Sequence, residues 1–188
     1  MSLAWKLGPR VEGHDYKIFK TSFVEGASPV DGHVRTFSIV EATDWVNVIA
    51  LTRQDHVVLV RQFRFGTRQV CLEIPGGMVD PGEAPLDAAK RELEEETGYT
   101  AREWRLIGKS APNPAFQTNT LHSYLALDAE LTAAVRPDGD EVIEVSTEPL
   151  GRVQELIRRG AIDHALVLVA FAHLAMQVSE LHRPPPRP

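Results

Sequence analysis

The stretch that decides the fold runs from residue 76 to residue 99 and reads Gly-Gly-Met-Val-Asp-Pro-Gly-Glu-Ala-Pro-Leu-Asp-Ala-Ala-Lys-Arg-Glu-Leu-Glu-Glu-Glu-Thr-Gly-Tyr. It predicts a glycine-containing loop followed by a helix over Pro85–Thr97. Pro85 suits the first helical position, and Gly98 suits the residue just past the end. The apolar stripe at helical spacing, which we expect to be buried, consists of Leu86, Ala89 and Leu93.

Negative charge is concentrated near the C-terminal end of this helix. At about 100° per residue, Glu92, Glu95 and Glu96 share one side, whereas Glu94 points away from it. These charges repel one another and meet the negative end of the helix dipole. A divalent cation would reverse those penalties, so the pattern predicts a site of carboxylate and carbonyl oxygens, which suit Mg²⁺ or Mn²⁺. A solvated acidic face is the alternative, because glutamate is also a good helix former.

Composition limits the class of protein. The 188 residues are 43% hydrophobic, enough for one substantial core. A formal charge of −6 argues against nucleic acid or an anionic membrane as the main partner, because both require a basic surface. Cys71 is the only cysteine, which favours a reducing cytoplasm. The most apolar stretch, 165–176, is too short to span a bilayer.

Alternating apolar and polar residues predict strands on both sides of the acidic helix. The predicted strands are 16–24, 33–40, 46–51, 56–65, 70–74, 104–108, 122–127 and 142–145, and two further helices are predicted at 150–159 and 164–182. The polar residues 52–55 form a break short enough for an antiparallel hairpin. A loop is predicted at 75–77, where two glycines permit backbone angles that other residues resist. The order of elements predicts a mixed α/β domain, and residues 183–188 form a proline-rich tail.

The spacing of Gly77, Glu83 and the run 91–99, Arg-Glu-Leu-Glu-Glu-Glu-Thr-Gly-Tyr, resembles the Nudix hydrolase signature at every fixed position. The resemblance implies an α/β/α sandwich with a mixed sheet and hydrolysis of a nucleoside diphosphate linked to another moiety. It implies that residues 45–182 form the Nudix core. Residues 1–44 would then be N-terminal strands of the same domain, available for a homodimer and for covering the substrate.

The resemblance also implies roles for individual residues. It implies four metal ligands, namely the carbonyl of Gly76 and the side chains of Glu92, Glu95 and Glu96. Glu83 and Arg91 are similar to the pair that holds the loop against the catalytic helix, with an ordinary surface ion pair as the alternative. The implied catalytic set is Glu83, Arg91, Glu96 and a general base from the loop 138–141. Glu141 is the favoured base, Asp140 or Glu144 could replace it, and an acidic surface loop is the simpler interpretation.

Basic groups for the substrate phosphates are expected from Arg61, Arg64 or Arg68, along and after the strand that leads to the glycines. Arg64 is the first choice, although each of these residues could instead be a solvated charge at a strand edge. Glu73, just before residues 74–76, could touch metal or sugar, and a structural hydrogen bond is the equal alternative.

The substrate is indicated by residues 72–77, Leu-Glu-Ile-Pro-Gly-Gly, which are similar to the same stretch of ADP-ribose and nucleotide-sugar pyrophosphatases. Pro114 resembles a proline associated with ADP-ribose hydrolysis. Residues 115–119 depart from that branch, because they read Ala-Phe-Gln-Thr-Asn in place of a glycine-x-serine-x-glutamate pattern. The resemblance therefore implies ADP-ribose first, cleaved to AMP and ribose 5-phosphate. Another nucleoside diphosphate sugar such as GDP-mannose ranks second, and triphosphates rank third.

Two further alternatives follow from the same resemblance. A non-catalytic Nudix nucleotide-binding sensor would keep the pocket without turnover, although the complete glutamate set argues against it. In the ADP-ribose branch, the residues that could cover the nucleobase are Tyr16, Phe19, Phe37 and Trp45, and packing in the core is the simpler interpretation for each.

Overall fold

The computed structural model describes residues 3–136 and 142–181 and divides into two compact units. Met1–Asp44 and Ala111–Thr120 form the first unit, and Trp45–Ser110 and Leu121–Pro188 form the second. The predicted tail at 183–188 lies outside the described residues. Within the described part of the chain, no helix has the length and apolarity that crossing a membrane requires.

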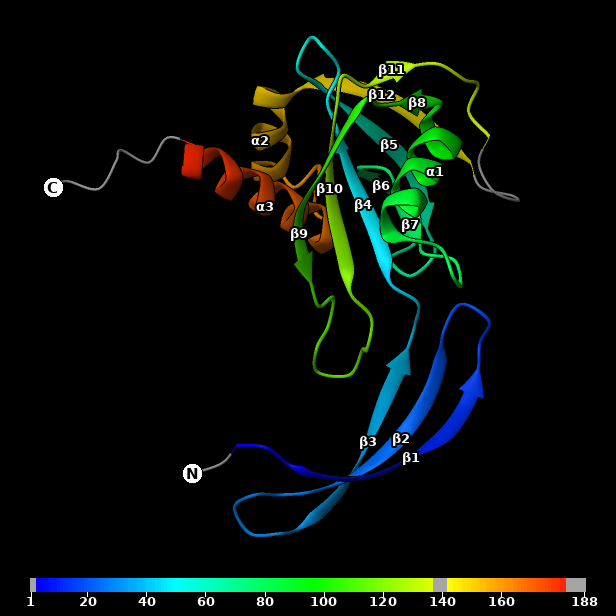
Figure 1. Cartoon of the computed structure of the whole chain (residues 1–188), viewed down its shortest axis with the longest axis vertical. Helices are drawn as coiled ribbons and strands as arrows, with labels where there is room; N and C mark the ends of the chain where they lie inside the picture. Colours follow the sequence, from blue (N-terminus) through cyan, green and yellow to red (C-terminus); the bar gives the residue numbers. More distant parts are fainter. Residues whose placement is uncertain (1–2, 137–141, 182–188) are drawn as a thin grey trace, which may run out of the picture. The chain divides into compact units, whose positions relative to one another are not determined.

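The first unit is built on a three-stranded antiparallel sheet in the order β1-β2-β3 (Figure 1). Its strands are β1 (Lys6–Asp15), β2 (Lys20–Ala27) and β3 (Val34–Glu41). The segment 111–120 joins β3, because the amide of Val40 donates to the carbonyl of Phe116 at 2.7 Å. β1 was not predicted, since its glycines and proline are depleted in strands and tolerated mainly at an edge. Tyr16 and Phe37 are exposed, so the core interpretation is wrong for these two aromatic residues.

The described residues of the second unit form two main sheets and three helices. One sheet has the order β7-β4-β10-β9, made of β7 (Gly76–Met78), β4 (Trp45–Ala50), β10 (Leu121–Leu127) and β9 (Glu103–Ser110). The other has the order β12-β5-β6, made of β12 (Ile143–Pro149), β5 (His56–Arg64) and β6 (Gln69–Glu73). A short pair consists of β8 (Tyr99–Thr100) and β11 (Glu130–Leu131), and the helices are α1 (Pro85–Thr97), α2 (Leu150–Arg158) and α3 (Ala165–Leu181).

Strand β4 sends alternate side chains to two cores, one on each face of the sheet. Val46, Val48 and Ala50 belong to a cluster with Ala88, Ala89 and Leu93 of α1. Ile49 and Leu51 belong to the other cluster, with Val153 of α2 and Val167 of α3. The sheets therefore lie between α1 on one side and α2 and α3 on the other (Figure 1), which confirms the α/β/α sandwich.

Two local predictions were wrong. The predicted hairpin between 46–51 and 56–65 does not form, because β4 pairs in parallel with β10 and antiparallel with β7, while β5 pairs with β6 and β12. A single bridge between Leu51 and Val57 joins the two segments. Residues 76–78 form β7 rather than a loop, and the positive-φ glycines of the described chain do not include Gly76 or Gly77. What matters at Gly76 and Gly77 is that glycine has no side chain, as described below for the active site.

Candidate active site

Helix α1 has defined ends and a buried face. It begins with Pro85 after Ala84, and it ends at Gly98, whose φ of 73° is left-handed and whose amide donates to the carbonyl of Glu94 at 2.7 Å. Ala89 and Leu93 are fully buried, as the predicted stripe requires. Packing of this face places the adjacent side of the helix, which carries Glu92 and Glu96, beside β7.

Gly77 allows the helix and β7 to approach closely. A Cβ atom built on Gly77 would overlap the carboxylate of Glu92, and one built on Gly76 would overlap the carbonyl of Val46. Any larger residue at either position must push apart the backbone or the glutamate. The two glycines are therefore required by space, and the backbone angles are ordinary.

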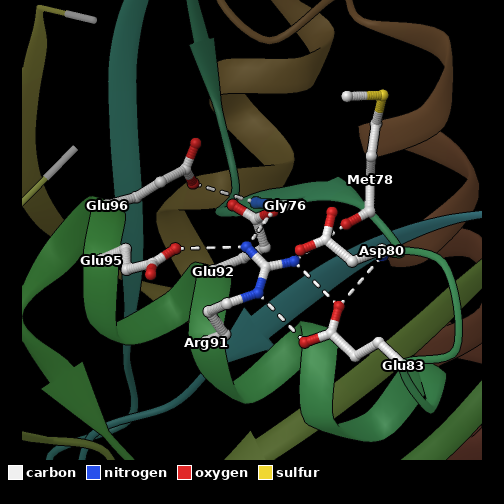
Figure 2. Close-up of polar contacts among 8 residues, drawn as sticks. All are labelled: Gly76, Met78, Asp80, Glu83, Arg91, Glu92, Glu95 and Glu96. Carbon is white, nitrogen blue, oxygen red and sulfur yellow. Dashed lines mark hydrogen bonds and ion pairs between the residues drawn. The ribbon is translucent and has the colours of Figure 1, made fainter. Parts of the chain in front are cut away.

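Arg91 is the centre of the polar network on this face (Figure 2). Its Nε and Nη2 atoms donate to the two oxygens of Glu83, both at 3.0 Å. Its Nη1 donates to Glu92 Oε1 at 2.9 Å and to Glu95 Oε2 at 3.2 Å, and Nη2 also reaches the carbonyl of Met78 at 3.0 Å. The hydrogen bond with Glu83, and then the charge of Glu92, raise the pKa of Arg91. One guanidinium thus ties the loop, β7 and the helix together.

Glu83 closes the turn that precedes the helix. Its Oε2 accepts the amide of Asp80 at 3.1 Å, and its own amide donates to the carbonyl of Asp80 at 3.0 Å. The hydrogen bond from Arg91 lowers the pKa of Glu83. The predicted pairing of Glu83 with Arg91 is confirmed. Its fork geometry and partial burial distinguish it from an ordinary surface ion pair.

Glu96 lies apart from the arginine network. Its side chain is buried, and its Oε2 accepts the amide of Gly76 at 3.0 Å, whereas Glu94 is exposed (Figure 2 shows the contact to Gly76). In this arrangement, the described residues hold no group of three or more His, Cys, Asp or Glu side chains that could bind one metal ion. The chemistry still fits a divalent cation, because Glu92 and Glu95 already direct carboxylate oxygens at one positively charged atom, Arg91 Nη1.

A second polar cluster surrounds Glu73, at the end of β6. Arg64 approaches it as a fork, with Nε to Oε1 and Nη2 to Oε2 both at 2.8 Å. His164 Nδ1 contacts the same Oε2 at 2.8 Å. The side chain of Glu73 is 2% exposed, and that of Arg64 is 40% exposed. The structural hydrogen bond expected as one role for Glu73 is therefore present, and Arg64 is held by this carboxylate.

The remaining predicted residues lie in several places. Arg61 and Glu144 are opposite one another on β5 and β12, and both line a groove of about 520 Å³ on that sheet. Arg68 is exposed and follows Arg64 in a tight turn. Pro114 belongs to the first unit, in the segment Ala111–Thr120. The favoured base Glu141, like Asp140, lies outside the described residues.

Two groups in these clusters were not predicted. His164 was assigned only to a helix, and nothing in the sequence pattern pairs it with Glu73, which is 91 residues away. The contact of Arg91 with Met78 uses a backbone carbonyl, so no side-chain type in the sequence indicates it. Both contacts depend on how β6, β7 and the helices pack, so periodicity and motif spacing do not reveal them.

Comparison with known proteins yields one family and several relatives. The NUDIX domain matches residues 43–171. The ADP-ribose pyrophosphatase of Bacillus subtilis is 31% identical over 82% of this chain and 84% of its own length. The ADP-sugar pyrophosphatase of Mus musculus is 32% identical over 83% and 78%, and the methanol dehydrogenase activator of Bacillus methanolicus is 30% identical over 81% and 83%.

A solved structure has the same fold. The crystal structure of an ADP compounds hydrolase superposes with a TM-score of 0.83 at 22% identity and covers 98% of this chain and 100% of its own. At this identity, the likeness shows the fold alone.

Proposed function

Because the chain belongs to the Nudix family of hydrolases, we propose that it cleaves the diphosphate bond of ADP-ribose to give AMP and ribose 5-phosphate. One observation carries the proposal, namely that Arg91 binds the carboxylates of three glutamates, Glu83, Glu92 and Glu95. Next to this network, the carboxylate of Glu96 accepts a hydrogen bond from the amide of Gly76 in β7. The names of the Bacillus subtilis and Mus musculus relatives support an ADP-linked substrate. Other nucleoside diphosphate sugars, such as GDP-mannose, rank second.

Nudix hydrolases generally use divalent metal ions, and Mg²⁺, with Mn²⁺ as a substitute, is the ion proposed for this chain. The carbonyl of Gly76 and the carboxylates of Glu92, Glu95 and Glu96 would hold it, since hard cations take oxygen ligands. When bound, the ion would neutralise diphosphate charge and lower the pKa of a water molecule. Glu83 and Arg91 keep the helix against β7, so that these oxygen atoms stay on one side.

Arg64 is proposed to contact the substrate phosphates, because its partly exposed guanidinium is already oriented by Glu73. An oriented arginine loses less side-chain freedom when it binds an anion. Arg61 is the second candidate for this role. Glu141 is proposed as the general base on the basis of the family resemblance, and Glu144 is its alternative. A cytoplasmic location is proposed from the single cysteine.

A homodimer is proposed from the first unit, whose sheet exposes large apolar residues. Four of them are Leu7, Val11, Phe23 and Phe37. Val11 and Phe23 are directly opposite one another on β1 and β2, so both point to the same face of the sheet. Exposed apolar patches of this kind mark interaction surfaces. The mass in solution, measured by light scattering at micromolar concentration, should be twice that of the chain. The double substitution of Val11 and Phe23 to Lys should reduce it to one chain.

The proposed activity is tested with the purified full chain, Mg²⁺ and a panel of substrates. The panel contains ADP-ribose, GDP-mannose, a dinucleoside polyphosphate and a nucleoside triphosphate, with products separated by anion exchange. We expect ADP-ribose to have the highest kcat/KM, and EDTA to abolish turnover until excess Mg²⁺ or Mn²⁺ restores it. No release of AMP from ADP-ribose under any metal condition would contradict the proposal.

One relative favours a second candidate function. The protein from Bacillus methanolicus carries the name of an activator, which is consistent with a regulatory role for a Nudix chain. A nucleotide-binding sensor would bind ADP-ribose in calorimetry without producing AMP in the same sample. The two candidates are therefore separated by measuring binding and turnover on one preparation.

A further inference from the structure

The cluster around Glu73 contains a histidine to which the proposed function gives no role. We propose that His164 is a positioning residue that acts through the carboxylate of Glu73 to fix Arg64 for binding the substrate diphosphate. This inference rests on the proposed function, which assigns Arg64 to the substrate phosphates.

The geometry links the three side chains through one carboxylate. Glu73 Oε1 accepts a hydrogen bond from Arg64 Nε, and Glu73 Oε2 accepts one from Arg64 Nη2, each at 2.8 Å. His164 Nδ1 lies 2.8 Å from Oε2, so this oxygen has two nitrogen partners on different elements. A carboxylate held from two directions cannot rotate without breaking one contact. The orientation of the Arg64 fork therefore depends on the imidazole as well as on Glu73.

Charge determines which atom carries the proton. Burial by itself raises the pKa of Glu73, but the hydrogen bonds from Arg64 and His164 prevail and lower it to about 2. Glu73 is therefore ionised at neutral pH and can only accept hydrogen bonds. His164 must then carry its proton on Nδ1, whether the ring is neutral or charged. The contact persists across the neutral pH range, as a positioning role requires.

The backbone at His164 is itself anchored. Its carbonyl accepts the amides of Val167 and Leu168, both at 3.0 Å, at the start of α3. Next to it, the side-chain Nδ2 of Asn47 donates to the carbonyl of Leu166 at 2.9 Å and ties the first turn of α3 to β4. The imidazole thus projects from an anchored backbone. Arg64, by contrast, is the last residue of β5, and its side chain is 40% exposed, so a dissolved anion can reach it.

The test combines steady-state kinetics on ADP-ribose with calorimetric binding of α,β-methylene ADP-ribose, which is not cleaved. His164→Ala should raise KM and the dissociation constant about tenfold while kcat changes less than about twofold, because the lost contact serves binding. His164→Asn should recover most of the affinity, since its amide can donate from nearly the same place. If His164→Ala does not fold, His164→Leu replaces it.

A double-mutant cycle separates positioning from general stability. In an Arg64→Ala background, His164→Ala should change the dissociation constant less than about twofold, because Arg64 is no longer present to be positioned. His173→Ala is the matched control, since His173 lies on α3, the helix that directly follows His164, and contacts Ser110 Oγ at 3.0 Å. It should lower the melting temperature and leave KM unchanged.

The outcomes discriminate between the two proposals. If Arg64→Ala weakens binding and His164→Ala does not, the positioning role is overturned and the proposed function stands. An equal effect of His164→Ala with and without Arg64 also overturns it. If Arg64→Ala itself leaves binding of the analogue unchanged, the phosphate role of Arg64 is wrong, and the inference fails with it.

Discussion

Two arginine–glutamate clusters of the second unit, one around Arg91 and one around Glu73, differ in charge balance. Around Arg91, one guanidinium is shared among the carboxylates of Glu83, Glu92 and Glu95. Around Glu73, one carboxylate is shared between Arg64 and His164. The first cluster keeps an excess of negative charge and suits a cation. In the second cluster, basic groups balance the single carboxylate, so this cluster suits an anion. A metal-bound diphosphate needs both kinds of site, one for the cation and one for the negative phosphates.

Burial distinguishes the two clusters as well. The side chain of Glu73 is 2% exposed, whereas that of Arg91 is 26% exposed. Removing a partner of the buried Glu73 carboxylate is costly, because this carboxylate has no water to replace the lost hydrogen bond. Partly exposed contacts are cheaper to exchange. We therefore expect the Glu73 cluster to act as a fixed frame, and the Arg91 cluster to rearrange when its carboxylates meet a metal ion.

The largest effect is expected from Glu96→Gln, which leaves the hydrogen bond to Gly76 intact and removes the charge. Loss of one carboxylate that would hold the metal ion should lower kcat by about 10²–10³-fold. The measurement is release of AMP from ADP-ribose at saturating Mg²⁺, with circular dichroism to verify the fold. Glu94→Gln, on the exposed side of the same helix, should keep activity within about twofold, because it lies outside the site. Equal activity of wild type and Glu96→Gln would reject the metal role.

The next effect tests the close approach of β7 and α1. Gly77→Ala introduces a methyl group where the carboxylate of Glu92 lies, so the glutamate must move. Activity should fall by about 10–100-fold, since small displacements of a positioned group are costly in catalysis. A higher Mg²⁺ concentration at half-maximal activity should accompany this loss. Gly151→Ala, which has open space around its Cβ position, should leave both quantities as they are.

These two predictions rest on residues that the sequence already identifies, and the reason is local chemistry. Pro85 and Gly98 mark the ends of α1, and the spacing of its glutamates needs only the helical period. The partners of β4 could not be predicted this way, because a short polar link fits both a hairpin and a crossing between two sheets. The role of His164 was not predicted either, because local sequence does not determine which distant residue it contacts. Its partner Glu73 is brought near by packing over 91 intervening positions.

A third prediction concerns the buried cluster and its pH dependence. Glu73→Gln removes the charge that Arg64 and His164 share, and it should lower the free energy of unfolding at pH 7 by about 2 kcal/mol, because hydrogen bonds to a charged group are weakened. The folded pKa of Glu73 lies at about 2, below its ordinary value of 4.5. Its contribution is therefore complete above about pH 4.5 and is lost as pH falls toward 2.

Urea unfolding of wild type and Glu73→Gln at several pH values measures this contribution. The difference between the two proteins should narrow steadily below pH 4.5. Glu103→Gln is the control, because its ion pair with Arg105 is mostly exposed. It should change stability by less than about 0.5 kcal/mol. A difference between wild type and Glu73→Gln that stays constant down to pH 3 would show that the carboxylate charge is not what the cluster needs.

The smallest effect is expected from a substitution in the partly buried cluster around Arg91. Arg91→Lys keeps the positive charge, but a single ammonium cannot make the fork with Glu83 and also reach Glu92, Glu95 and Met78. Unfolding free energy should fall by about 1 kcal/mol, because the contacts are only partly buried.

The matched substitution Arg105→Lys, on an exposed pair, should cost less than about 0.5 kcal/mol. Adding Mg²⁺ should stabilise wild type and Arg91→Lys alike if the metal takes over the carboxylates, because the ion then supplies the charge that the guanidinium supplied. A stabilisation by Mg²⁺ that disappears in Arg91→Lys would mean that the fork, and not the charge alone, keeps the glutamates in place for the ion.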